Sequence, residues 1–397
     1  MIAGAIQTVT SGDRVTRSSQ LSWNGEEEQL WIDLPAELAR EDDDASELLP
    51  ACLLQAMRRH EDLEIEGRVS PRMLRASDTA QAVFHAWDLS IRRASVAVGS
   101  REPSERGRRG SGCFFSRGVD SMHAAVLARM RGDAPTLIFC DRFDAIQGEE
   151  TRAGERTRAA RAAGVLDLPL AIAETNLRTI TDPLMDWSDM HGGGLGFIAL
   201  SLAGGLERVT IPSTHSPRTV GPWGSSPYID PLWSTEAVEV VHGALAARPA
   251  KVAVIAEHAP SLLPLLKVCF REDTPDNCGR CNKCLLTMVN LEAQGLLEAA
   301  TSFPALELEL VAAQRPGNFA MRLFWLEAHR SLSPERRHRD LRRAIERLLR
   351  GVARPGPVER LRRREFRRHP RSDEGGAFGR HRTNSAVSLM LEGEPYP

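Results

Sequence analysis

The chain has 397 residues, a formal net charge of −2 and an apolar fraction of 42%. This length allows two or three domains, and the near-neutral charge gives no overall attraction to nucleic acid or to a membrane. No apolar run reaches the roughly 18 residues of a membrane span, and no basic segment followed by an apolar one opens the chain. The sequence therefore favours a cytoplasmic protein.

Residues 1–100 carry short strand-like runs, such as residues 29–34, and a helical pattern at residues 48–57. We expect a small N-terminal α+β domain here, and its residues indicate no particular chemistry. Residues 100–111 are rich in Arg, Glu, Gly and Ser and indicate a linker.

Strand and helix patterns alternate over residues 110–305. Strands are predicted at residues 113–115, 136–140, 168–173, 208–211 and 251–256, and helices at residues 121–130, 152–163 and 195–202. This order predicts the α/β class, with a Rossmann-like parallel sheet covered by helices on both faces. Ligands of such sheets bind beyond the carboxyl ends of the strands.

Arginines dominate residues 306–397, a basic helical extension whose apolar residues keep helical spacing up to Arg350. From about Pro370 the composition is typical of disorder. This Arg-rich region is a candidate for RNA binding, although a solvated helix face explains such clusters more often.

A polar loop, Ser116-Arg117-Gly118-Val119-Asp120-Ser121, follows the first predicted strand of residues 110–305 and precedes a helix. It resembles the PP-loop signature Ser-Gly-Gly-x-Asp-Ser of ATP pyrophosphatases. Such a turn directs N–H groups and the positive end of the helix dipole at one point, which suits pyrophosphate. The hydroxyls of Ser116 and Ser121 can donate to phosphate oxygens, and Asp120 can help to hold Mg²⁺. An ordinary strand–turn–helix junction with Ser or Asp as the helix cap is the alternative.

Arg117 occupies the position of the signature's first glycine. A positive φ there would strain an arginine, because its Cβ crowds the backbone. Its guanidinium could instead reach a phosphate. The arginine is also compatible with two other hypotheses: a site with weakened activity, and a protein that binds nucleotide without catalysis.

Four of the seven cysteines form a C-x8-C-x2-C-x2-C pattern: Cys269, Cys278, Cys281 and Cys284. Four converging thiolates complete the tetrahedral shell of Zn²⁺ and leave no position for water, so we expect a structural zinc ion. An iron–sulfur cluster is the main alternative, since the tight C-x2-C-x2-C spacing also occurs in ferredoxins.

The order of the two motifs resembles the 7-cyano-7-deazaguanine synthase family of queuosine biosynthesis, over about residues 110–305. The resemblance implies an ATP-dependent C–N ligase with ATP, Mg²⁺ and Zn²⁺ as cofactors. In the implied reaction, ATP adenylates an oxygen of a carboxylate or amide and pyrophosphate leaves. Ammonia or an amine then displaces AMP. The substrate would be a small molecule or a terminal carboxylate. An RNA-modifying PP-loop enzyme that uses the basic extension is the alternative function. No membrane contact is expected, and a homodimer is left open.

Further candidates lie at predicted strand ends and in nearby loops. Asp141 follows the second strand, where adenosine would lie, or caps a loop. His215, beside Ser213 and Thr214, could contact substrate or phosphate, or be an ordinary exposed histidine. The remaining candidates have weaker signals. His191 with Gly192 to Gly194 could approach nucleotide or substrate, or form a flexible helix entry. Asp230 and Glu236 could line the substrate side, and Trp223 and Trp233 are more often packing residues than stacking platforms. Lys283 could reach phosphate or be a solvated lysine.

Overall fold

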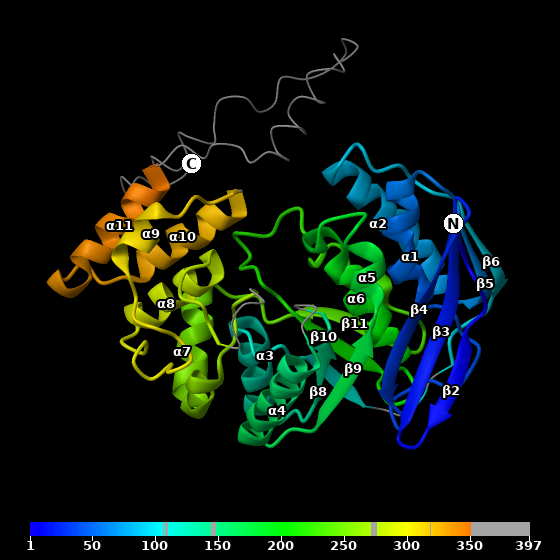
Figure 1. Cartoon of the computed structure of the whole chain (residues 1–397), viewed down its shortest axis with the longest axis horizontal. Coiled ribbons are helices and arrows are strands. Elements are labelled where there is room, and N and C mark those ends of the chain that lie inside the picture. Colours follow the sequence, from blue (N-terminus) through cyan, green and yellow to red (C-terminus); the bar gives the residue numbers. More distant parts are fainter. Residues whose placement is uncertain (106, 108–109, 144–147, 271–275, 318, 351–397) are drawn as a thin grey trace, which may run out of the picture. The chain divides into compact units, whose positions relative to one another are not determined.

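The computed structural model describes residues 1–105, 107, 110–143, 148–270, 276–317 and 319–350 (Figure 1). The chain divides into two compact units, Met1–Leu306 and Glu307–Pro397. The expected boundary at residues 100–110 lies inside the first unit. Within the described residues, no helix has the length and apolar character needed to cross a bilayer.

One mixed sheet runs through the first unit. In the described residues its eleven strands are β1 (Ile2–Ala3), β2 (Gln7–Ser11), β3 (Arg14–Trp23), β4 (Glu26–Pro35), β5 (Leu63–Val69), β6 (Val96–Arg101), β7 (Ser111–Phe114), β8 (Thr136–Asp141), β9 (Leu170–Thr175), β10 (Arg208–Pro212) and β11 (Glu239–Gly243). The order is β11-β10-β7-β8-β9-β4-β3-β1-β5-β6, and β2 pairs with β3.

The strands from β11 to β9 form a parallel block with the order β11-β10-β7-β8-β9. The chain runs outward from β7 to β8 and β9, and then returns to place β10 and β11 on the other side of β7. The direction of winding therefore reverses between β7 and β10. Such a switch point opens a crevice at the carboxyl ends of the strands.

The sheet does not end at this parallel block. β4 pairs antiparallel with β9, with Ile32 opposite Thr175, and the N-terminal strands continue from there (Figure 1). The α/β class is confirmed and is compatible with a Rossmann-like fold, but the sheet is mixed rather than wholly parallel. A pairing between residues about 140 positions apart leaves no local sequence signal, because it depends on tertiary packing.

Helices flank the sheet on both faces. The helices of the first unit are α1 (Leu48–Arg59), α2 (Pro71–Trp87), α3 (Val119–Met130), α4 (Glu149–Leu166), α5 (Leu177–Thr181), α6 (Trp187–Ser201), α7 (Arg248–His258) and α8 (Asn282–Ala293), with short 3₁₀ turns η1 (Asp230–Trp233) and η2 (Pro260–Leu265). Neighbouring strand residues enter different cores: Phe114 and Ile138 pack with α1 and α6, whereas Cys113 and Leu137 pack with α3, α4 and α7. Alternation along a strand places these two cores on opposite faces.

One predicted strand is wrong. Residues 251–256 belong to helix α7, and the fifth parallel strand is β11, a few residues upstream. The run is short and apolar, so its period was ambiguous. Lys251, Val252 and Ile255 are its buried residues, which is helical spacing, and a proline stands in the helix's first turn.

The second unit contains α9 (Leu308–Ala313), α10 (Phe319–Ser331), η3 (Arg336–His338) and α11 (Arg339–Arg350). Along α11 the buried residues are Leu341, Ala344, Ile345, Leu348 and Leu349, as the helical spacing predicted. The arginine clusters at residues 362–364 and 367–368 and the end predicted to be disordered lie outside the described residues.

Candidate functional site

The 116–121 loop joins β7 to α3 beside the switch point. Gly118 is the residue before the helix, with φ −70° and ψ 162°, and the first turn of α3 begins at Val119. Ser121 Oγ accepts a hydrogen bond from the Ser116 amide at 3.2 Å and donates to the Gly118 carbonyl at 3.1 Å. These bonds fold the loop over the positive end of the α3 dipole.

Arg117 adopts the conformation that the signature's glycine would take, with φ 61°. Its side chain is buried, forms an ion pair with Glu155 of α4 and donates to the Leu265 carbonyl at 3.3 Å. The Lys267 amide donates back to the Arg117 carbonyl at 3.1 Å. The guanidinium is therefore bound to protein groups, and it fastens the loop to α4 and to residues 265–267.

Asp120 lies in the first turn of α3 and meets two cations from α7. Lys251 Nζ is 2.7 Å from Oδ1, and Arg248 Nη2 is 3.1 Å from Oδ2. Burial alone would raise the pKa of Asp120, but Arg248 and Lys251 hold it below its ordinary value. Lys251 also donates to the carbonyl of Ser213 at the end of β10. Sequence reasoning missed both cations, because they lie in and beside the run that was assigned to a strand.

A group of imidazole and indole rings adjoins the end of β10. His215 and Ser213 are buried, and the His215 amide donates to Ser213 Oγ at 3.1 Å. The Trp223 ring lies 5.9 Å from His215 and 5.8 Å from His191 of α6, between ring centroids. Burial, reinforced by nearby cationic groups, lowers the pKa of each histidine to about 4, so both rings are neutral at neutral pH.

The glycines that follow His191 serve helix packing. A Cβ on Gly192 would lie 2.0 Å from the Gly224 carbonyl oxygen, and a Cβ on Gly193 would lie 2.5 Å from the Pro50 carbonyl oxygen. These positions therefore let α6 approach its neighbours closely, which neither proposed explanation, a ligand approach or a flexible helix entry, had anticipated.

Asp141, at the end of β8, is buried among arginines. It accepts from the Arg142 amide at 2.9 Å and from Arg152 at 3.4 Å, and it forms an ion pair with Arg156. Glu174 of the neighbouring strand joins the cluster through Arg142 and Arg152. These contacts fix the carboxylate among protein partners, and nucleotide binding by Asp141 stays a prediction.

The two acidic candidates downstream have protein partners of different kinds. Glu236 accepts from the Ser70 hydroxyl at 2.6 Å and from the Arg72 amide at 3.0 Å, so it caps the start of α2. Asp230 pairs with His242 of β11, a residue that sequence reasoning did not single out. Trp233 is fully buried and packs against Gly196.

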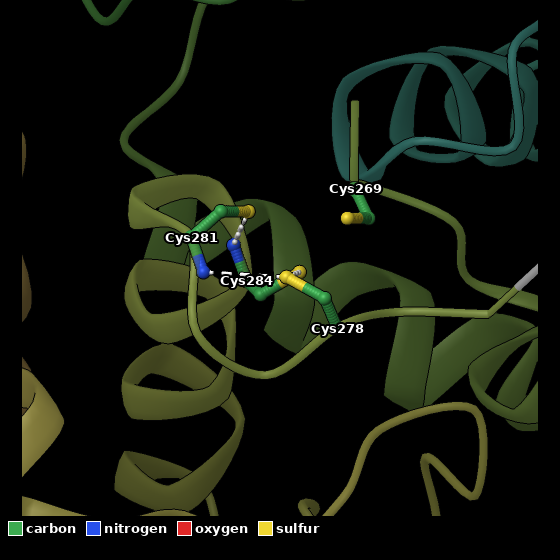
Figure 2. Close-up of side chains that lie close together, drawn as sticks. All are labelled: Cys269, Cys278, Cys281 and Cys284. Atoms are coloured by element: carbon green, nitrogen blue, oxygen red, sulfur yellow. Dashed lines mark hydrogen bonds between the residues drawn. The ribbon is translucent and has the colours of Figure 1, made fainter. Parts of the chain in front are cut away.

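The four cysteines converge as predicted. Their sulfur atoms all lie within 4.8 Å of one another, although Cys269 is separated from the others along the chain by residues that include the undescribed 271–275 (Figure 2). Cys281 precedes α8, and its sulfur accepts from the Cys284 amide at 3.4 Å. Cys278 Sγ accepts from the amides of Arg280 and Cys281 at 3.4 Å and 3.3 Å. Gly279, between Cys278 and Arg280, has a left-handed conformation with φ 64°.

The cysteine cluster fits a metal ion such as zinc. Tetrahedral zinc with bonds of about 2.3 Å places its sulfur ligands about 3.8 Å apart, and Cys278 and Cys284 are 3.9 Å apart. Hydrogen bonding from the thiol and the amide of Cys284 lowers the pKa of Cys281 to about 5, and the same pairing with burial raises the pKa of Cys284, so one thiolate of this pair is favoured. The Asn277 side chain accepts from the Val268 and Cys269 amides at 2.9 Å and 3.1 Å and thereby fixes the approach of Cys269. An iron–sulfur cluster stays the alternative.

Lys283, between the last two cysteines, lies with its Nζ 5.6 Å from the centroid of the Phe270 ring. Its charge contributes to the lowered pKa of both Asp120 and His191. It therefore belongs electrostatically to the region between the cysteine cluster and the 116–121 loop.

The loop, the two cations of α7, the rings beside β10 and the four cysteines all belong to the unit Met1–Leu306. Comparison of this chain with protein-family models, with curated proteins and with solved structures finds no match.

Proposed function

We propose that this protein is an ATP pyrophosphatase of the PP-loop type, which activates a carboxylate or amide by adenylation for attack by ammonia or an amine. The observation that carries the proposal is the position of the 116–121 loop. It lies at the switch point of the parallel block of the sheet and at the positive end of α3, with Arg248 and Lys251 beside it. This combination suits a polyphosphate.

Each part of the loop has a distinct role in the proposed reaction. The amides at the start of α3 and the hydroxyls of Ser116 and Ser121 would bind the phosphates of ATP. Arg248 and Lys251 would stabilise the charge that develops on the leaving pyrophosphate. Asp120 supplies a carboxylate of the kind that Mg²⁺ takes together with phosphate oxygens, and the ion would neutralise part of that charge.

The cysteine cluster would support the loop rather than take part in catalysis. Four thiolates fill the coordination shell of zinc and leave no open position. Asn277 connects this cluster to Val268, and the neighbouring Lys267 amide binds the Arg117 carbonyl. Metal binding would therefore fix residues 267–269, and through them the loop.

Release of AMP and pyrophosphate tests the proposal. A panel of carboxylic acids and amides is incubated with the full-length protein, ATP, Mg²⁺ and an ammonium salt, and both products are measured. We expect at least one acid to give both products, and the Asp120→Ala variant to give neither. Asp133→Ala removes an exposed carboxylate that pairs with Arg131 and is the matched control. Absence of both products across the panel would reject the proposal.

RNA modification is the second candidate, because α11 exposes arginines opposite its buried leucines. Arg343, Arg347 and Arg350 all lie on that exposed side. Arginines that contact phosphates release counterions, so their affinity falls with salt. Replacing all three with glutamine should weaken tRNA binding and flatten its salt dependence. Unchanged binding in the variant would remove this candidate from consideration.

A further inference from the structure

A buried histidine–aspartate pair lies at the carboxyl end of β11, outside the residues that the proposed adenylation uses. The His242 Nδ1 atom is 2.7 Å from Asp230 Oδ2, and both side chains are almost completely buried. Asp230 also accepts from the Ser225 hydroxyl at 2.7 Å and from the Ser226 amide at 3.3 Å. Burial raises the pKa of Asp230, whereas the bonds from His242, Ser225 and Ser226 act in the opposite direction and favour the carboxylate.

This geometry fixes the tautomer of His242. Asp230 is an acceptor, so the proton of the neutral imidazole is on Nδ1 and the lone pair is on Nε2. The Nε2 atom is buried and has no hydrogen-bond partner among the described residues. A buried polar atom without a partner costs free energy, and such atoms occur where a group is reserved for a ligand or a proton.

The pair is connected to the 116–121 loop through the end of β10. His242 lies beside Ile211 of β10 in the parallel register, one residue before the strand's end. His215, which follows β10, is close enough to both Asp120 and His242 for each to shift its pKa. Lys251 bridges Asp120 to the Ser213 carbonyl. Polar and ionisable groups thus extend from the loop, across the switch point, to the histidine.

We infer that His242 is the general base that accepts the proton of the attacking ammonia or amine. In this step the amine nitrogen forms a bond to the acyl carbon of the adenylated substrate. The bond between that carbon and the phosphate oxygen breaks, and AMP leaves with the electron pair. One proton of the nitrogen passes to Nε2, and Asp230 stabilises the resulting imidazolium. The inference rests on the proposed function.

Neither of the neighbouring groups can take this part as well. The Lys251 Nζ atom is already occupied as a donor to Asp120 Oδ1 and to the Ser213 carbonyl. His215 has a pKa of about 4, which makes its imidazole a weak base at neutral pH. His242 has the carboxylate partner that an imidazolium requires.

The His242→Asn variant separates the base from the structural contact. The asparagine amide nitrogen can replace Nδ1 as the donor to Asp230, whereas no atom replaces the Nε2 lone pair. Ammonium must lose one proton before attack and a second one as the amide forms. Hydroxylamine is unprotonated at neutral pH and loses only the second proton, and its less basic nitrogen gives that proton up to water more readily. We expect ammonia-dependent turnover to fall roughly 10²–10⁴-fold in the variant, and hydroxylamine-dependent turnover to fall much less. His258→Asn, at the end of α7, is the control.

Two measurements distinguish failure of the inference from failure of the proposed function. Exchange of labelled pyrophosphate into ATP reports adenylation alone, and its absence with every acid rejects the proposed function. Exchange in the wild type combined with equal losses for ammonia and hydroxylamine in His242→Asn rejects only the inference. The ¹⁵N shifts of His242 in the full-length protein provide a test without substrate. We expect the Nδ1–H tautomer at neutral pH, and the Nε2–H tautomer or a protonated ring would overturn the inference.

Discussion

The cysteine cluster and the 116–121 loop are assembled in different ways. The cluster takes three of its four sulfurs from residues 278–284 and fixes them with amides of the same segment. The loop takes its cations from α7, about 130 residues away, and its anchor Glu155 from α4. A site made from one segment is largely specified locally, whereas the loop depends on the packed fold.

This difference predicts how each region responds to change. Loss of a thiolate would remove one of the four ligands of the expected metal ion and with it the support of the local arrangement. Loss of one long-range contact at the loop leaves the other contacts in place. The effects on stability should therefore be large at the cluster and graded at the loop.

The largest effect is expected at the cluster. Cys284→Ala should lower bound zinc from about one ion per chain to none, because structural zinc contributes on the order of 10 kcal/mol in small zinc domains. Metal analysis and thermal unfolding measure the loss. Cys140→Ser, at a half-buried cysteine outside the cluster, should keep the metal. Iron in place of zinc in the purified wild-type protein would favour the iron–sulfur cluster. A wild-type protein purified without any metal would reject the metal site.

A pH effect of up to about 3 kcal/mol is expected beside the loop. His123 of α3 is buried, and its burial and the nearby Lys251 lower its pKa from the ordinary value of 6.5 to about 4. The unfolded chain binds a proton below pH 6.5 that the folded protein accepts only near pH 4. The free energy of unfolding should therefore fall as the pH is lowered through this window.

Urea unfolding at several pH values tests this expectation by comparing the wild type with His123→Gln. The variant should lose less stability between pH 6.5 and pH 4, whereas His258→Gln should follow the wild type. Protonation of the cysteines at low pH affects all three proteins alike and cancels in the comparison. Parallel curves for the wild type and His123→Gln would show that the histidine titrates normally.

Lys251→Met tests the cation at the loop. The lysine side chain is fully buried, and its removal leaves Asp120 with Arg248 as its cationic partner. Breaking a buried pair costs about 3–5 kcal/mol, and the partial exposure of Asp120 reduces this to roughly 2 kcal/mol. Adding Asp120→Asn should recover part of the loss, because the carboxylate that has lost one of its two cationic partners is then neutral. Strict additivity in urea unfolding of the double variant would contradict direct coupling.

The parts of the fold that could be predicted are those with local signals. The strands before and after the loop, helix α4 and the converging cysteines follow from residue patterns within short windows. The run at residues 251–256 was assigned to a strand because a short apolar run has no distinct period. The β4–β9 pairing, the Lys251–Asp120 contact and the His242–Asp230 pair could not be predicted, since each joins segments that only tertiary packing brings together.

The smallest effect concerns Arg117, where a local signal and a long-range contact meet. Both Arg117→Gly and Arg117→Ala lose the ion pair with Glu155, but only alanine keeps the strain of φ 61°. The Arg117→Ala variant should therefore be less stable than Arg117→Gly by about 1 kcal/mol, which is the cost of a left-handed conformation for a residue with a Cβ. Urea unfolding of the two variants measures this difference. If the Arg117→Gly variant releases pyrophosphate and the wild type does not, Arg117 prevents catalysis at the loop. The natural chain would then bind nucleotide without turning it over.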